Sequence, residues 1–192
     1  MQLFNENKLK QSNTGWSITG CTGNSLVEEA NPTKIKIKKP LLIKQINKII
    51  QKNYSFMGYT KFVNLIKNIM GENEDEIKTM LLRRVFDDVL VIIDEAHNLR
   101  SILQKTGGDD ILDELVKRTN TMRLCLLTGT PMYNEPSEIL WLLNLLNKND
   151  NKPPIIKKDV FNSDGGLVVD DKGNNIGLVN LQNQMRGYVS FV

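Results

Sequence analysis

Two runs of apolar residues, each ending in a polar cluster, set the strongest limit on how this chain can fold. The run "VLVIID" ends at Asp94, and the run "RLCLLTG" ends at Gly129. A continuous apolar run of this length is typical of a strand covered on both faces, as in a parallel sheet. We therefore expect two buried strands that deliver polar side chains to one edge of a sheet.

Segments with helical periodicity alternate with these runs. Residues 54–59, "YSFMGY", are expected to form another short strand, and residues 101–110, "SILQKTGGDD", a loop. Apolar residues at helical spacing predict helices near residues 41–50, 62–70 and 77–81, and over residues 110–119 and 137–146. Alternating strands and helices predict an α/β fold with a parallel sheet flanked by helices.

The chain divides into three expected regions. Residues 1–15 are polar and are expected to be poorly ordered, and residues 16–148 form the main α/β domain. Residues 149–192 form an extension, in which "GGLVVDDKGNNIGLV" predicts a β-hairpin around an Asp-Lys-Gly-Asn turn. The acidic residues of that turn do not have the spacing of a calcium-binding loop.

Positive charge is concentrated in one segment. The formal net charge is only +3, yet nine lysines and no acidic residue lie between Asn31 and Met70. Such a segment suits a polyanionic partner such as nucleic acid. A solvated lysine-rich helix face explains the same pattern, and composition does not separate the two interpretations.

Cysteine and histidine usage excludes several classes of protein. Cys21 and Cys125 are too few for a disulfide framework, which favours a reducing intracellular compartment over secretion. His97 is the only histidine, so zinc-protease and zinc-deaminase signatures are absent. No apolar run has membrane-spanning length and the polar N-terminus is no signal peptide, so we expect no membrane partner.

The polar residues after the two strands have a consistent chemical use. Ligands of open parallel sheets bind at the carboxyl ends of the strands, where Asp94, Glu95, Thr128 and Thr130 are expected. Asp94 suits a magnesium ion, held through water, because Mg²⁺ prefers oxygen ligands and bridges to nucleotide phosphates. Glu95 can position or deprotonate the water that attacks a γ-phosphate.

These motifs resemble a known family. "VIIDEAH" resembles the Walker B element, or DEAH box, of superfamily 2 helicases and translocases. "LLTGTPMYNEPSEILWLLNLL" is similar to motif III of the Swi/Snf-like branch and of large-DNA-virus helicases, including the viral early transcription factor helicase subunit. The resemblance extends over residues 16–192, with its most specific motifs between residues 89 and 146. It implies part of the first RecA-like ATP-binding lobe, with residues 149–192 leading toward a second lobe.

The resemblance also implies roles for individual residues. Asp94 would bind Mg²⁺, Glu95 would be the catalytic base, and His97 would relay nucleotide state to motif III. Thr128 and Thr130 would couple hydrolysis to movement between lobes. "WSITGCTGNS" and "FMGYTKFVN" resemble the family's nucleic-acid-contacting segments, which implies backbone contacts by Thr22, Gly23, Asn24 and Thr60. The implied cofactors are ATP and Mg²⁺, and the implied place is the cytoplasm, virion or viral factory.

Each motif also has an ordinary structural interpretation. Asp-Glu after a strand often begins a helix, a lone histidine is usually a satisfied polar residue, and Thr-Gly-Thr-Pro is often only a turn. The combination of these motifs, in order and on adjacent expected strands, favours helicase ancestry over these interpretations.

The sequence contains no Gly-x-x-x-x-Gly-Lys-Ser/Thr, the loop that cradles nucleotide phosphates. We therefore expect the chain to bind and hydrolyse ATP poorly unless a longer product or a partner chain supplies this P-loop and the second lobe. The alternative is a non-catalytic remnant that binds nucleic acid or a transcription complex. The sequence does not separate DNA from RNA, or unwinding from translocation.

Overall fold

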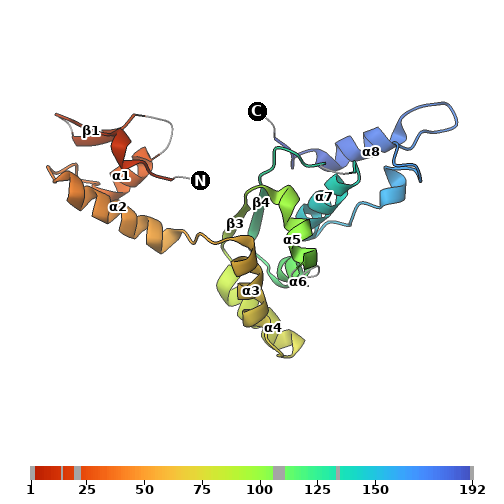
Figure 1. Ribbon diagram of the computed structural model, residues 1–192, viewed down its shortest axis with the longest axis horizontal. Helices are drawn as coiled ribbons and strands as arrows, with labels where there is room; N and C mark the ends of the chain where they lie inside the picture. The colour runs from red at the N-terminus through yellow and green to blue at the C-terminus, as the bar shows by residue number, and fades with distance from the viewer. Residues whose placement is uncertain (1–2, 14, 20–22, 106–110, 133–134, 191–192) are drawn as a thin grey trace. The chain divides into compact units, whose positions relative to one another are not determined.

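The computed structural model describes residues 3–13, 15–19, 23–105, 111–132 and 135–190. The chain forms two compact units, Met1–Met57 and Gly58–Val192, and each is described by itself (Figure 1). This division was not expected from the sequence. The domain boundaries predicted at residues 16 and 149 stay predictions.

The first unit consists of a β-hairpin and two helices. The hairpin pairs β1 (Leu9–Ser12) with β2 (Gly15–Ile18) in antiparallel register, with Leu9 opposite Ile18. The helices are α1 (Asn24–Ala30) and α2 (Lys39–Asn53), and a 3₁₀ turn, η1 (Glu6–Lys8), precedes the hairpin. The core of this unit consists of Leu9, Ile18, Leu26, Val27, Leu42 and Ile46.

The hairpin differs from the expected poorly ordered N-terminus. Leu9 and Ile18 are both buried in the same apolar cluster, so the two strands share a hydrophobic face. Gly15 has a φ of 126°, a conformation that glycine adopts without the steric cost of a Cβ atom. The apolar partner of β1 therefore lies after the turn, where the polar composition of the first 15 residues gives no sign of it.

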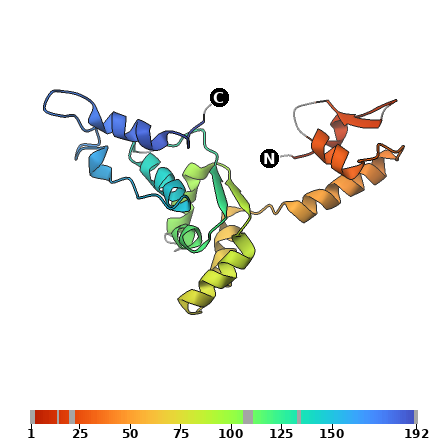
Figure 2. The same ribbon diagram turned by 180° about the vertical axis from the view of Figure 1, so that it is seen from behind.

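The second unit contains a parallel pair of strands. β3 (Leu90–Ile93) pairs with β4 (Arg123–Leu126), with Leu90 opposite Arg123 and Ile93 opposite Leu126. The helices and 3₁₀ turns are α3 (Tyr59–Met70), α4 (Asp75–Phe86), η2 (Ala96–Asn98), α5 (Leu99–Lys105), α6 (Ile111–Arg118), α7 (Glu138–Asn149), η3 (Lys157–Asp159) and α8 (Ile176–Met185). Figure 2 shows the same pair of strands from behind. This arrangement confirms the predicted α/β fold and is consistent with a partial RecA-like lobe.

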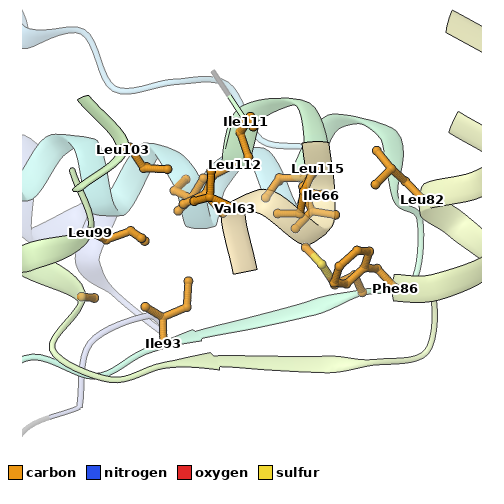
Figure 3. Close-up of a cluster of buried hydrophobic side chains, with 14 of the residues drawn as sticks. Val63, Ile66, Leu82, Phe86, Ile93, Leu99, Leu103, Ile111, Leu112 and Leu115 are labelled. Carbon is orange, nitrogen blue, oxygen red and sulfur yellow. The ribbon is translucent and has the colours of Figure 1, made fainter. Parts of the chain in front are cut away.

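The main core lies between the strands and the helices on one side of them. Val63 and Ile66 of α3 meet Leu82 of α4, Leu115 of α6 and Ile93 of β3 (Figure 3). All five side chains are buried. Within the described chain the strands are covered on this face alone, because Leu90 and Ile92 are 58% and 45% exposed. The sequence predicted strands buried on both faces, but in the described residues only one face of the β3–β4 pair is buried.

The edge of β4 that faces away from β3 is bonded to a side chain. The Leu124 N–H donates to Asn149 Oδ1 at 3.1 Å, and Asn149 Nδ2 donates to the Met122 carbonyl at 3.1 Å. Asn149 is the last residue of α7. These two bonds fix the end of α7 to the start of β4.

The C-terminal extension differs from the predicted hairpin. Phe161 and Leu167 form an isolated antiparallel bridge, but the segment expected as the second strand is helix α8. The turn between them exists, with the Asp170 carboxylate accepting the backbone N–H groups of Lys172 and Asn174. Apolar residues of the helix and of the bridged segment pack with α7, which favours a helix after this turn. The cluster contains Ile139, Leu140, Leu143, Ile155, Val160, Phe161, Leu167, Leu181 and Met185.

Two further expectations were wrong. Residues 54–58 form no strand, and Tyr59 already begins α3. Residues 101–105 belong to α5 rather than to a loop, and residues 106–110 lie outside the described part of the chain. In the part of the chain that the structure describes, no helix combines the length and apolarity needed to cross a membrane.

Candidate functional site

The predicted polar residues lie at the carboxyl ends of β3 and β4. Hydrogen bonds continue past the strands, because the Leu127 N–H donates to the Ile93 carbonyl and the Ala96 N–H donates to the Leu127 carbonyl, both at 2.8 Å. The two turns after the strands are thereby held side by side. The sequence predicted this juxtaposition because parallel strands end at one edge of a sheet.

A histidine connects these two turns. His97 Nδ1 and Thr128 Oγ1 lie 2.9 Å apart, and the direction of this hydrogen bond depends on the imidazole tautomer. The same nitrogen lies 3.5 Å from Glu95 Oε2. The Thr130 N–H donates to Thr128 Oγ1 at 3.2 Å. Glu95, His97, Thr128 and Thr130 therefore form one connected group, and the roles that the resemblance implies for them stay predictions.

The backbone of the acidic turn has an unusual conformation at Glu95. This residue has φ 51° and ψ 47°, the left-handed region that non-glycine residues occupy at a cost of roughly 1–3 kcal/mol. Its N–H donates to Asp94 Oδ1 at 3.1 Å. The Glu95 side chain is 61% exposed and that of His97 only 17% exposed. The turn therefore presents the Glu95 carboxylate to solvent beside a largely covered imidazole.

Tyr59 holds this turn from a different element. Its hydroxyl, at the start of α3, donates to the carbonyl of Asp94 and lies 3.2 Å from the carbonyl of Glu95. Burial, and then the negative charges of Asp94 and Glu95, raise the pKa of the Tyr59 phenol above its ordinary value. Sequence reasoning singled out the neighbouring Thr60 and missed Tyr59, because no local pattern marks a contact across 35 residues.

The acidic pair offers only part of a metal site. Asp94 and Glu95 supply carboxylate oxygens, the donor type that Mg²⁺ prefers. Within the described residues, no group of three or more histidine, cysteine, aspartate or glutamate side chains is placed to hold a metal ion. This donor set fits a magnesium ion that keeps several waters and takes its other ligands from phosphate oxygens. It does not fit a metal held by protein groups alone.

The predicted nucleic-acid contacts fall in both units. Thr22 lies outside the described residues, while Gly23 and Asn24 begin α1 in the first unit. The Asn24 side chain accepts the Ile18 N–H at 2.8 Å and donates to the Ile18 carbonyl at 3.1 Å, which is a structural role. Thr60 is exposed in the first turn of α3, in the second unit. Their contacts with nucleic acid stay predictions.

The family model of the SNF2-related domain matches residues 68–164, which include both strands and both polar turns. The chain belongs to the SNF2-related domain family. No solved structure matches the chain.

Relatives of this SNF2-related chain include viral helicases and a viral transcription factor. It is 28% identical to "Putative helicase 009L" of frog virus 3 over 152 residues, which are 78% of this chain and 14% of that protein. It is 27% identical to "Putative ATP-dependent RNA helicase R563" of Acanthamoeba polyphaga mimivirus over 182 residues, 89% of this chain and 29% of that protein.

A third relative is the early transcription factor 70 kDa subunit of Melanoplus sanguinipes entomopoxvirus. The two are 26% identical over 148 residues, 76% of this chain and 20% of that protein. The chain thus spans less than a third of each of these three relatives. The SNF2-related match and these relatives give the chain helicase or translocase ancestry.

Proposed function

We propose that the chain carries the magnesium- and water-positioning part of an ATP-hydrolysis site in the first lobe of a helicase or translocase. The observation that carries this proposal is the group formed by Glu95, His97 and Thr128 at the ends of two parallel strands. If the acidic turn and the Thr-Gly-Thr turn were unrelated structural turns, no hydrogen bond between them would be expected. Helicase or translocase ancestry supplies the reaction class.

Each residue then has a defined task. Asp94 would hold Mg²⁺ through water, and the ion would supply positive charge to neutralise the nucleotide phosphates. Glu95 orients the attacking water and accepts its proton, for which an exposed carboxylate at the strand end is suited. His97, hydrogen-bonded to Thr128, connects the acidic turn to the Thr128–Thr130 turn. A shift of either turn thereby changes the position of the imidazole beside Glu95.

The phosphate-binding half of the site must come from other residues. Preorganised groups of this kind supply about 3–4 kcal/mol of transition-state stabilisation apiece in well-studied cases, and the printed sequence contains no P-loop motif. We therefore expect weak ATP binding and almost no turnover by this chain alone. The proposed partners are a segment that carries the P-loop and the second lobe, in a longer product or in a second chain, together with nucleic acid and a transcription complex, in an infected cell or a virion.

Paramagnetic broadening by Mn²⁺, which favours the same oxygen ligands as Mg²⁺, tests the metal site without turnover. Backbone NMR signals of Asp94 and Glu95 should broaden at low Mn²⁺ concentration in the unmodified chain. Asp94→Asn should remove this broadening, and Asp171→Asn, at an exposed acidic residue of the extension, should not. Broadening that is equal in all three proteins would contradict the proposed site.

Turnover tests the role of Glu95 separately. Glu95→Gln should abolish hydrolysis in a complex that contains a P-loop, and should change nothing measurable in the isolated chain. Glu95-dependent turnover by the purified chain would show that the half-site proposal is wrong. Nucleic-acid binding without a metal site at Asp94 would favour the alternative, a non-catalytic binding protein, for which the lysine-rich first unit is the supporting observation.

A further inference from the structure

The two units have net charges of opposite sign. Residues 1–57 contain nine lysines and three glutamates, a net charge of +6, whereas the whole chain has +3. Residues 58–192 therefore carry −3. The basic unit lies entirely outside residues 68–164, so the SNF2-related match gives it no role.

Three of these lysines form a straight row on α2. Lys44, Lys48 and Lys52 are spaced four residues apart, which places them on one face of the helix over about 12 Å. All three are exposed, while Leu42 and Ile46 on the opposite face are completely buried. Packing of the apolar face fixes the direction in which the lysines point. The helix is labelled in Figure 1.

None of these three lysines forms an ion pair with a described residue. Among the described residues, the ion pairs within 4 Å that involve lysine or arginine all lie in the second unit, at Lys78, Arg118, Lys148 and Lys152. The three lysines of α2 take part in none. Their charge is therefore directed to solvent rather than neutralised within the unit.

An exposed aromatic pair follows this row directly. Tyr54 and Phe56 are 46% and 60% exposed, although aromatic rings of this size usually bury most of their surface. The two rings are stacked on each other, with centroids 6.3 Å apart and planes 13° apart. Tyr54 caps the C-terminal end of α2, so the pair begins two residues after Lys52.

We propose that the exposed face of α2 and the Tyr54–Phe56 pair form a binding surface for single-stranded nucleic acid. The lysine row contacts successive phosphates, and the two rings stack on unpaired bases, the combination by which single strands are held without sequence preference. A lysine is a point charge without the fork of an arginine, so it suits the backbone rather than a base edge. This inference adds a nucleic-acid-binding surface outside the proposed ATP-hydrolysis site. It rests on the proposed function only for the choice of nucleic acid as the ligand.

Other polyanions fit this surface less well. A membrane surface would attract the lysines, but the apolar face of α2 that such a helix would place in the bilayer, with Leu42 and Ile46, is already buried in the core of the unit. Along α2, which the structure describes in full, Leu41 is the only exposed large apolar side chain, and the two rings follow the helix. An acidic protein would give no use to the stacked rings. A duplex would engage the lysines but offers no unstacked base to Tyr54 and Phe56. The ring pair is therefore the feature that selects a single strand.

Fluorescence anisotropy with a labelled oligothymidylate tests the proposal on the full chain without nucleotide. Lys44→Gln, Lys48→Gln and Lys52→Gln combined should weaken binding at least tenfold. The slope of log K against log salt should become shallower by about 2, because each lost phosphate contact removes about 0.7. Lys157→Gln, Lys158→Gln and Lys172→Gln make the same charge change at exposed lysines of the second unit and should leave both quantities nearly unchanged.

The aromatic pair needs its own variant. Tyr54→Ala combined with Phe56→Ala should weaken binding of the single strand about tenfold or more and leave the salt slope unchanged, since stacking releases no counterions. Binding of a duplex of the same length should not change. Circular dichroism of every variant should match that of the unmodified chain, because the replaced side chains are exposed.

Several results would overturn the inference. They are absence of oligothymidylate binding, an equal loss in the two lysine triples, and stronger binding to anionic vesicles than to the oligonucleotide. Failure of the proposed function is recognised separately, because Asp94→Asn should leave oligonucleotide binding intact and the α2 triple should leave Mn²⁺ broadening at Asp94 intact.

Discussion

Gly177, in the first turn of α8, occupies a position that only glycine fits. A Cβ atom added there would overlap the carbonyl oxygen of Val160 and lie 2.7 Å from the Val168 nitrogen, and both are backbone atoms that cannot rotate away. The Gly177 N–H donates to the Val168 carbonyl at 2.9 Å, and the Val168 N–H donates to the Val160 carbonyl at 3.0 Å. Gly177→Ala must therefore separate α8 from the segment that it packs against.

The expected magnitude follows from these contacts. Overpacking costs about 1–3 kcal/mol, and each of the two lost backbone hydrogen bonds costs about 0.5–1.5 kcal/mol. Alanine is more favourable than glycine within a helix by about 1 kcal/mol, which offsets part of this loss. The net destabilisation of the α8 segment is about 1–5 kcal/mol.

Amide hydrogen exchange measures this loss where it occurs. Amides of residues 160–185 should exchange about tenfold faster for each 1.4 kcal/mol of lost local stability. Gly58→Ala is the matched control, since Gly58 has φ −75° and no heavy atom lies within 4 Å of the added Cβ. Unchanged exchange over residues 160–185 in Gly177→Ala would refute the packing of α8 described above.

Three further changes test other contacts. Tyr59→Phe removes the hydroxyl that bonds the acidic turn, so the turn around Glu95 should lose about 0.5–1.5 kcal/mol per bond, measured by hydrogen exchange there. Arg118, whose side chain is 11% exposed, bonds Glu114 at 2.6 Å; Arg118→Met should lower the free energy of unfolding of the second unit by about 1–3 kcal/mol, whereas Lys117→Met at an exposed position should not. Hydrogen bonds from the Asn174 side chain, and then from backbone N–H groups, lower the pKa of the Asp170 carboxyl. Its stabilisation of the turn should therefore be present above the carboxyl pKa of the unfolded chain and lost as pH falls through the folded value, measured by NMR titration with Asp170→Asn as the reference.

The parts of the fold that sequence predicted are those with a strong local pattern. The apolar run before Asp94 predicted β3, and the helical periodicity around Leu112 and Leu115 predicted α6. The α8 segment was misassigned because "NIGLV" carries β-branched residues next to a glycine turn. Its helical state depends on packing of Leu181 and Met185 with the α7 cluster, which no local pattern reveals.

The site divides in the same way. The proximity of the Glu95 and Thr128 turns was predictable, because it follows from two parallel strands ending at one edge, whereas a link through His97 was implied only by the resemblance. The left-handed backbone of Glu95 and the contact from Tyr59 were not, since both depend on how α3 packs beside the turn. The aromatic residues of "YSFMGY" predict a strand, because aromatic residues favour strands. Among described residues no neighbouring strand pairs with it, and the rings of Tyr54 and Phe56 are exposed instead.

Asn149 affects how a further strand can pair with the free edge of β4. A carboxamide offers the same donor and acceptor as a peptide group, so Asn149 occupies the Met122–Leu124 stretch of the β4 edge as a one-residue strand would. Arg123 and Leu127 direct their N–H groups to the other side, toward β3. An incoming strand thus finds its first two bonding positions taken and must begin pairing nearer Leu126. The Asn149 carboxamide thereby limits the register in which a further strand can pair with β4. It also covers part of this edge against unwanted pairing with another chain.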